Sequence, residues 1–211
     1  MMATTTQTFW IETMSGTRVD LPVPRADQVK IDDIAYSLAG QCRFNGHCRQ
    51  WYSVAEHSVH VSECLRRHGA QPRLRLLGLL HDAAEAYIGD VVSPVKALLV
   101  PAFRELENQV HGAILEALRI MYPSWWEQSR IGRADQMLLA TEAFYLMPSR
   151  GVAWGLRAQP DPAFVLAPPW SAGKAYKVFL DTYRELRPEG ASGTPFTRKC
   201  PSGPRREGAG A

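Results

Sequence analysis

The stretch LGLLHDAAEAY, residues 77–87, places His81, Asp82 and Glu85 inside a leucine- and alanine-rich segment. The apolar spacing predicts a helix from about residue 72 to residue 87 that is buried in a core. An imidazole and two carboxylates are costly to bury in such a helix unless something compensates them. A metal ion is the leading candidate, so its other ligands should lie elsewhere in the sequence.

The bulk composition is that of an ordinary globular protein. The chain has 211 residues, of which 45% are hydrophobic and 21% charged, which suits one domain with a substantial core. The net charge is +3, and residues 188–211 hold four basic and two acidic side chains, so the preceding body is nearly balanced. We therefore expect no nucleic-acid polymer as a partner. No run of uncharged apolar residues is long enough to predict a membrane span.

The cysteines predict free thiols. Cys42, Cys48, Cys64 and Cys200 form no CxxC pair and have no zinc-finger spacing. The first residues, MMATTTQTFW, do not look like a signal peptide. We therefore expect reduced cysteines and a cytoplasmic location.

The pattern along the chain predicts an all-α fold, a helical bundle with a small N-terminal β-hairpin around Ser15-Gly16. Ser53 and Glu56 have the spacing of a capping box, and Pro101 suits the first residue of a helix. Residues 1–187 are expected to form one domain, and the Pro- and Gly-rich residues 188–211 to be disordered. Helices are expected at about residues 31–40, 53–69, 72–87, 101–121, 125–147 and 172–186.

Metal-ligand residue types recur on other predicted helices. His57 lies near the start of one, and Asp135 lies within another. Imidazole nitrogen and carboxylate oxygen are ligands that divalent transition metals prefer. Adjacent side chains on a helix point about 100° apart, so His81 and Asp82 can straddle one ion in a groove between helices. Inward-projecting side chains of facing helices build such sites in bundles.

This order, H…HD…D, resembles the signature of the HD-domain metal-dependent phosphohydrolases. SVAEHSVHVS (residues 53–62) and HDAAEAYIGDVVSPVK (residues 81–96) look like the matching stretches of bacterial 5′-deoxynucleotidases and related phage-type HD nucleotide hydrolases. The likeness covers about residues 30–150. It implies an all-α fold, removal of phosphate from nucleotides and one divalent ion per site (Co²⁺, Mn²⁺, Mg²⁺ or Zn²⁺). The implied metal ligands are His57, His81, Asp82 and Asp135.

The resemblance also implies roles for neighbouring residues. Glu85 would orient or deprotonate the attacking water, and Asp90 would help to place that water or the leaving oxygen. Arg43 would bind phosphate. Phe44 would stack on the sugar and base or form a wall of the pocket beside them. Lys96 is a second candidate for the phosphate. Phe44 stands where the nucleotidases have tryptophan, which leaves base and sugar selectivity open.

Supporting residues are less well defined by the sequence. Glu56 and Glu142 are candidates for hydrogen bonds that hold the ligand imidazoles in one tautomer, but surface positions explain them equally well. His60, one helical turn after His57, is either a phosphate or proton-transfer group or a histidine satisfied within its helix.

The resulting hypothesis is an enzyme that hydrolyses phosphate from small deoxynucleotides, as 5′-monophosphates or as triphosphates, with a metal-activated water. One alternative is a non-catalytic HD protein that binds a nucleotide and regulates a partner. Another is an HD phosphodiesterase acting on a different phosphoester; the lack of histidines between His81 and His111 argues against its two-metal form. The amphipathic residues 101–122 would suit a homo-oligomer.

Overall fold

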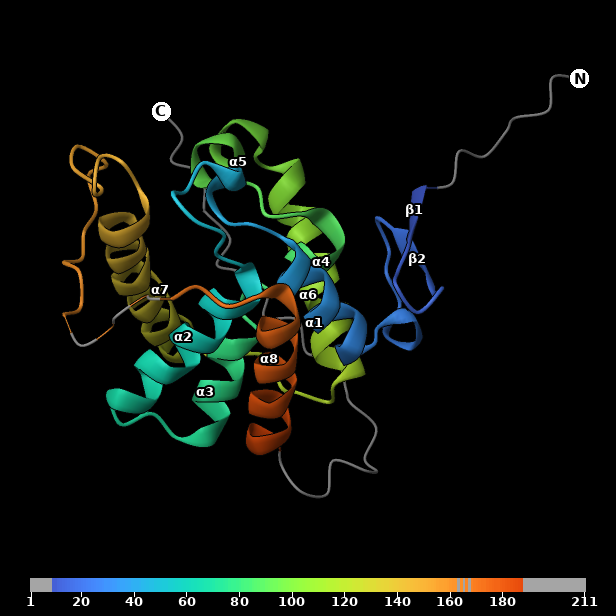
Figure 1. Cartoon of the computed structure of the whole chain (residues 1–211). Coiled ribbons are helices and arrows are strands. Elements are labelled where there is room, and N and C mark those ends of the chain that lie inside the picture. Colours follow the sequence, from blue (N-terminus) through green and yellow to red (C-terminus); the bar gives the residue numbers. More distant parts are fainter. Residues whose placement is uncertain (1–8, 163, 165, 167, 188–211) are drawn as a thin grey trace, which may run out of the picture.

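The computed structural model describes residues 9–162, 164, 166 and 168–187. Most of these residues are helical, and a two-stranded hairpin lies at one side of the helical body (Figure 1), so the predicted fold class is confirmed. The helices are α1 (Ile31–Gly40), α2 (Val54–Arg67), α3 (Pro72–Leu79), α4 (Glu85–Ile88), α5 (Ser93–Leu99), α6 (Ala102–Ala117), α7 (Trp125–Leu146) and α8 (Ala172–Leu186).

The hairpin pairs β1 (Phe9–Glu12) with β2 (Arg18–Leu21) in antiparallel register, Phe9 opposite Leu21. The predicted turn at Ser15-Gly16 is confirmed, with Gly16 at φ +74°, a conformation that glycine adopts without strain. Asp33 of α1 accepts hydrogen bonds from the backbone N–H of Ser15 at 2.9 Å and from its hydroxyl at 2.7 Å. These bonds fasten the hairpin turn to the helical body.

The core lies where α8 packs across α1, α2 and α3, in front of them in Figure 1. Ile34 and Leu38 of α1 and Phe179 of α8 are fully buried there. Helix α2 also packs against α7, so its own apolar side is enclosed. Burying large side chains of this kind contributes about 1.5–3 kcal/mol each, and it fixes α2, α3 and α7 relative to one another.

The expected single helix over residues 72–87 is wrong: α3 ends at Leu79 and α4 begins at Glu85. Between them the backbone closes tighter turns, with Ala83 N–H donating to the Leu80 carbonyl at 3.1 Å and Glu85 N–H to the Asp82 carbonyl at 3.0 Å. These bonds span three residues rather than the four of an α-helix. Apolar periodicity continues through the break because Ala83 and Ala84 are buried as well. His81 and Asp82 therefore sit in a turn.

The start of α2 forms only half of the expected capping box. The Ser53 hydroxyl accepts from Glu56 N–H at 3.1 Å, but the Glu56 carboxylate accepts from the backbone N–H of Trp170 at 3.1 Å. The segment before α8 crosses this helix end and offers the carboxylate a different donor. Burial raises the pKa of Glu56 to about 7. The expectations that Glu56 lies on the surface or supports a ligand imidazole are both wrong.

Two further boundaries differ from the expected ones. Pro101 is the residue before α6, and that helix ends at Ala117 rather than near residue 121. Arg119 has φ +56°, and Ile120 N–H returns to the Leu115 carbonyl at 2.8 Å, which stops the helix. Residues 188–211 lie outside the described residues, so the expected tail, and with it the domain boundary at residue 187, stays a prediction. Among the described residues no helix is long and apolar enough to cross a membrane.

Candidate metal centre

Three separate elements bring the predicted ligands together. His57 comes from the buried second turn of α2, His81 and Asp82 from the turn after α3, and Asp135 from α7. His57 Nε2 lies 3.3 Å from His81 Nε2 and 3.3 Å from Asp135 Oδ1. Asp82 Oδ2 lies 3.2 Å from His81 Nε2 and 3.6 Å from His57 Nε2. His57, His81 and Asp135 form a group that could hold a metal ion, and Asp82 borders it.

The hydrogen bonds on the far side of each imidazole define which nitrogen is free. His81 Nδ1 lies 2.8 Å from the Gly78 carbonyl, and His57 Nδ1 lies 2.6 Å from Glu142 Oε1. A carbonyl and a carboxylate can only accept, so both Nδ1 atoms carry protons. In the neutral rings both Nε2 atoms then present lone pairs to the same point.

This donor set fits a divalent cation. Two Nε2 lone pairs and two carboxylates face one another at 3.2–3.9 Å, an arrangement that repels itself unless a positive charge lies within it. Donors about 2.1 Å from one ion are separated by about 3.0–3.4 Å for tetrahedral or octahedral angles. His57 has no exposed side-chain surface, whereas the side chain of Asp135 is 30% exposed, so the centre opens on one side.

Glu142 is the carboxylate that orients His57. Its Oε1 also accepts from the Tyr52 hydroxyl at 2.9 Å, and its Oε2 accepts from Nε and Nη2 of Arg43 at 3.1 Å each. Burial alone would raise the pKa of Glu142, but Arg43 and His57 lower it below its ordinary value. Of the two support candidates named from the sequence, Glu142 contacts a ligand imidazole and Glu56 does not.

Tyr52 connects this carboxylate to His60. The Tyr52 hydroxyl has one proton, which it donates to Glu142, so it accepts from His60 Nδ1 at 2.9 Å. The His60 ring packs beside Tyr52, Phe164 and Trp170, with centroid separations of 6.1, 5.8 and 5.2 Å. His60 is thus satisfied three hydrogen bonds away from His57, through Tyr52 and Glu142, and does not line the cavity described next.

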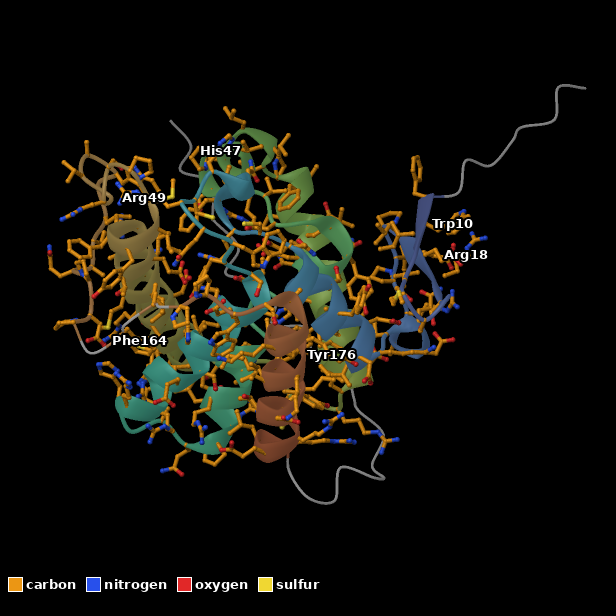
Figure 2. The ribbon with its side chains drawn as sticks, viewed as in Figure 1. Trp10, Arg18, His47, Arg49, Phe164 and Tyr176 are labelled. Atoms are coloured by element: carbon orange, nitrogen blue, oxygen red, sulfur yellow. The ribbon has the colours of Figure 1, made fainter. Side chains whose placement is uncertain are left out.

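A cavity of about 680 Å³ opens beside the candidate metal centre. It brings together every remaining residue that the sequence placed at the site. In Figure 2, His47 lies on the turn between α1 and α2, at the same end of the molecule as α5. This position agrees with its place on the cavity wall. The polar lining residues include Arg43, His47, Asp82, Glu85, Asp90, Lys96, Asp135 and Gln136, and the apolar ones include Phe44, Leu139, Met147 and Trp154.

Both cations of the lining already have carboxylate partners. Arg43 is held by Glu142, as described above, and its Nη1 lies 3.7 Å from Asp82 Oδ2. Lys96 Nζ is held between Glu85 Oε1 and Glu107 Oε1, at 2.9 Å from each. Arg43 thus keeps one nitrogen directed to the metal centre, whereas Lys96 neutralises two carboxylates.

Glu85 has one unsatisfied oxygen. The residue is 4% exposed, and its Oε2 has no hydrogen-bond partner among the described residues. Burial and the neighbouring Asp82 and Asp90 carboxylates raise the pKa of Glu85 to about 8, against the opposing effect of Lys96. Asp90 follows α4, and its backbone N–H donates to Gln41 Oε1 at 2.9 Å. A buried carboxylate oxygen without a partner is suited to accept a hydrogen bond from a bound water.

Sequence reasoning missed Trp154. It lies in the Gly- and Pro-rich connection after α7, and its ring centroid is 6.0 Å from that of Phe44, at an interplanar angle of 57°. The two rings stand together on the cavity wall. No periodicity marks a tryptophan in an irregular connection, so no sequence signal was available. For Glu142 a signal existed, because seven residues after Asp135 is the same face of a helix.

Comparison with known proteins agrees with this geometry. The profile described as "HD domain" matches residues 54–132, which include His57, His81 and Asp82. The uncharacterized protein YfdR of Escherichia coli (strain K12) is 32% identical over 178 residues, covering 84% of this chain and 95% of that protein. The chain belongs to the HD-domain family. The uncharacterized protein RCAP_rcc00048 of Rhodobacter capsulatus is 41% identical over 109 residues, covering 50% of this chain and 56% of that protein.

Membership in the HD-domain family implies metal-dependent phosphohydrolase chemistry. In this HD-domain protein the group that could hold the ion is His57, His81 and Asp135, and Asp135 lies three residues beyond the matched segment. Part of the cavity wall, including Arg43, Phe44 and Trp154, also lies outside that segment.

Proposed function

We propose that this protein is a metal-dependent nucleotide phosphohydrolase that removes phosphate from deoxynucleotides. The observation that carries the proposal is a single cavity lined by Asp82 and Asp135 of the candidate metal centre, the Arg43 guanidinium and an aromatic pair. A divalent cation, a phosphate and a nucleobase are the three chemical groups that these features suit.

His57, His81, Asp82 and Asp135 would hold the cation. When bound, such an ion supplies Lewis-acid polarisation of a phosphoryl oxygen and makes water available as a nucleophile near neutral pH. The chain's own contribution is alignment. Glu142 and the Gly78 carbonyl hold the two imidazoles by their Nδ1 protons, so both Nε2 atoms stay directed at one point.

Glu85 would accept a hydrogen bond from the attacking water at its unpartnered Oε2, while Lys96 holds the other oxygen. This fixes the carboxylate of a cavity-lining residue and leaves its Oε2 without a partner among the described residues. Asp90, on the same wall, would help to place that water or the leaving sugar oxygen. Positioned acid–base groups of this kind contribute roughly 10²–10⁴-fold to a rate.

The charge balance of the lining favours a monophosphate over a triphosphate. Four carboxylates, Asp82, Glu85, Asp90 and Asp135, face the cavity alongside the two cations Arg43 and Lys96. Lys96 is shared between two of the protein's own carboxylates, and Glu142 holds Nε and Nη2 of Arg43, which leaves Nη1 of Arg43 as the main phosphate ligand. A triphosphate needs further cations for its β and γ phosphates.

The test is turnover by purified, chelator-treated protein reloaded separately with Co²⁺, Mn²⁺, Mg²⁺ or Zn²⁺. We expect inorganic phosphate from 5′-deoxynucleoside monophosphates in the presence of at least one metal. Release of tripolyphosphate from triphosphates would instead assign the triphosphohydrolase. Turnover of phosphodiesters alone would favour the phosphodiesterase alternative, and nucleotide binding without hydrolysis the regulatory one. Asp82→Ala is the matched variant, expected to lose both metal content and turnover.

The aromatic pair provides a separate test of nucleotide recognition. Stacking on an aromatic ring contributes about 1–3 kcal/mol per base, so Trp154→Ala should raise KM for deoxynucleoside monophosphates by roughly 5- to 100-fold. Trp126→Ala is the control, because Trp126 is 50% exposed and is not among the cavity-lining residues. An unchanged KM in Trp154→Ala would remove base stacking from the proposal.

A further inference from the structure

Two cysteines bracket the turn that carries Arg43, Phe44 and His47. Cys42 Sγ and Cys48 Sγ lie 3.5 Å apart, and both residues are half-buried. Cys48 Sγ also donates to the Arg43 carbonyl at 3.7 Å. The two thiols are therefore in van der Waals contact at the base of a cavity-lining turn.

Both ends of this turn are fixed by backbone hydrogen bonds. Cys42 forms an antiparallel bridge with Ser53, and Arg43 N–H donates to the Tyr52 carbonyl at 2.9 Å. On the other side, Arg49 N–H donates to the Leu146 carbonyl of α7 at 2.9 Å. If the two sulfur atoms moved toward each other, the backbone of residues 44–47 would therefore have to adjust.

Those residues have little room to absorb a movement without changing conformation. Phe44 and Asn45 have φ of +57° and +52°, and Gly46 has φ of +77°. Positive φ is unfavourable for phenylalanine and is tolerated by asparagine and glycine. The turn is thus in a specific conformation that depends on the positions of its ends.

We propose that Cys42 and Cys48 form a reversible disulfide that changes the shape of the substrate pocket; this inference rests on the proposed function for its effect on turnover. The disulfide needs the sulfur atoms to approach by about 1.5 Å, to a bond length of about 2.05 Å. The cysteines have six-residue spacing, which suits a small loop closed within the chain.

The oxidant would be a low-molecular-weight disulfide, R–S–S–R. The Cys42 thiol loses its proton to solvent, and the thiolate attacks one sulfur of the oxidant to form a mixed disulfide and release R–S⁻. The Cys48 thiolate then attacks Cys42 Sγ and releases the second R–S⁻. Both cysteines are oxidised, one R–S–S–R is reduced to two R–SH, and the protons given up by the protein thiols are taken up by the released thiolates. Burial raises the pKa of the Cys48 thiol to about 11, and that thiol donates to the Arg43 carbonyl, so Cys48 is assigned the second attack.

The effect should fall on substrate binding and not on the metal. Phe44 and His47 lie on the cavity wall, whereas His57, His81 and Asp135 come from other elements. Misplacing binding groups by about 1 Å can cost up to roughly 100-fold in rate. We expect oxidation to raise KM for the nucleotide about tenfold, to leave metal content unchanged, and to be reversed by dithiothreitol.

The experiment treats the full-length protein with oxidised glutathione. Mass spectrometry of alkylated, digested protein should show a Cys42–Cys48 linkage. Cys42→Ser and Cys48→Ser should lose both the linkage and the response of KM. Cys64→Ala is the control; Cys64 is buried, with its Sγ 3.9 Å from Met137 Sδ, and this variant should behave as the wild type. Hydrogen exchange over residues 42–48 should slow on oxidation and recover on reduction.

The linkage and hydrogen-exchange measurements need no turnover, so they test the disulfide even if the nucleotide assignment fails. Mixed glutathione adducts without a Cys42–Cys48 linkage would overturn the proposal. If the linkage forms in active protein without changing KM, the proposal that the disulfide controls the substrate pocket is wrong.

Discussion

Nδ1 of His57 donates a hydrogen bond to Glu142 Oε1 over 2.6 Å, and neither side chain has exposed surface. Glu142 lies two turns after Asp135 on α7. One helix thus supplies both a candidate metal ligand and the carboxylate that aligns another ligand. Such outer partners set the tautomer and basicity of a ligand imidazole.

Replacing Glu142 with Gln should weaken metal binding by roughly 10- to 100-fold, because the neutral amide is a weaker acceptor for His57 Nδ1–H. Calorimetric titration of metal-free protein with Zn²⁺ or Mn²⁺ measures this change. The variant should also unfold at a lower temperature, since Arg43 loses its buried counter-charge. Glu105→Gln, on the exposed face of α6, serves as the control. Equal metal affinity in both variants would show that Glu142 does not support the centre.

Glu85→Gln should keep its metal and lose turnover. The amide retains the volume of the carboxylate but cannot accept a proton, so we expect a fall in kcat of roughly 10²–10⁴-fold. Metal content by elemental analysis and kcat from phosphate release are the two measurements. A variant with wild-type kcat would exclude Glu85 from the reaction, and one without metal would assign it a structural role.

Alanine substitutions at Gly78 and Gly132 should change the stability of the protein in opposite directions. A Cβ at Gly78 would collide with Leu65 Cδ1, because α3 approaches α2 closely at this point. We expect Gly78→Ala to destabilise the protein by about 1–3 kcal/mol. Gly132 lies on α7 with open space around the same position, so Gly132→Ala should stabilise by about 0.5–1 kcal/mol. Urea unfolding measures both; a neutral Gly78→Ala would mean that the packing of α2 on α3 adjusts freely.

His60 should make stability depend on pH. Burial lowers its pKa to about 4, whereas the unfolded value is about 6.5. The unfolded chain therefore binds the proton more readily, so the contribution is fully present above about pH 6.5 and is lost as the pH falls toward about 4.

For the metal-free protein, the free energy of unfolding should fall by about 2 kcal/mol between about pH 7.5 and about pH 5 because of His60. His60→Asn keeps an amide donor for Tyr52 and cannot titrate, so its unfolding free energy should fall less over the same range. Parallel curves for the wild type and His60→Asn would contradict the assigned pKa.

The sequence was most informative where one feature decides a structure. The Ser53 cap predicted the start of α2, and Gly16 marked the hairpin turn. It was least informative where two interactions compete. At residues 80–84 apolar burial continues although the helical hydrogen bonds do not, and at Glu56 a segment more than a hundred residues away replaces the local cap.

The candidate site shows the same contrast. His57, His81, Asp82 and Asp135 could be named from residue type and order because metal binding restricts both. Trp154 could not, because its place beside Phe44 depends on how an irregular connection folds back over the cavity.

The cavity walls come from parts of the chain on both sides of the segment that carries His57, His81 and Asp82. Arg43 and Phe44 precede that segment, and Leu139, Met147 and Trp154 follow it. The reacting centre and the surface that selects a substrate are therefore encoded separately and can change independently. Two chains with the same centre can act on different molecules, and exchanging residues 42–48 and 147–156 between them is a direct way to transfer substrate preference without rebuilding the chemistry.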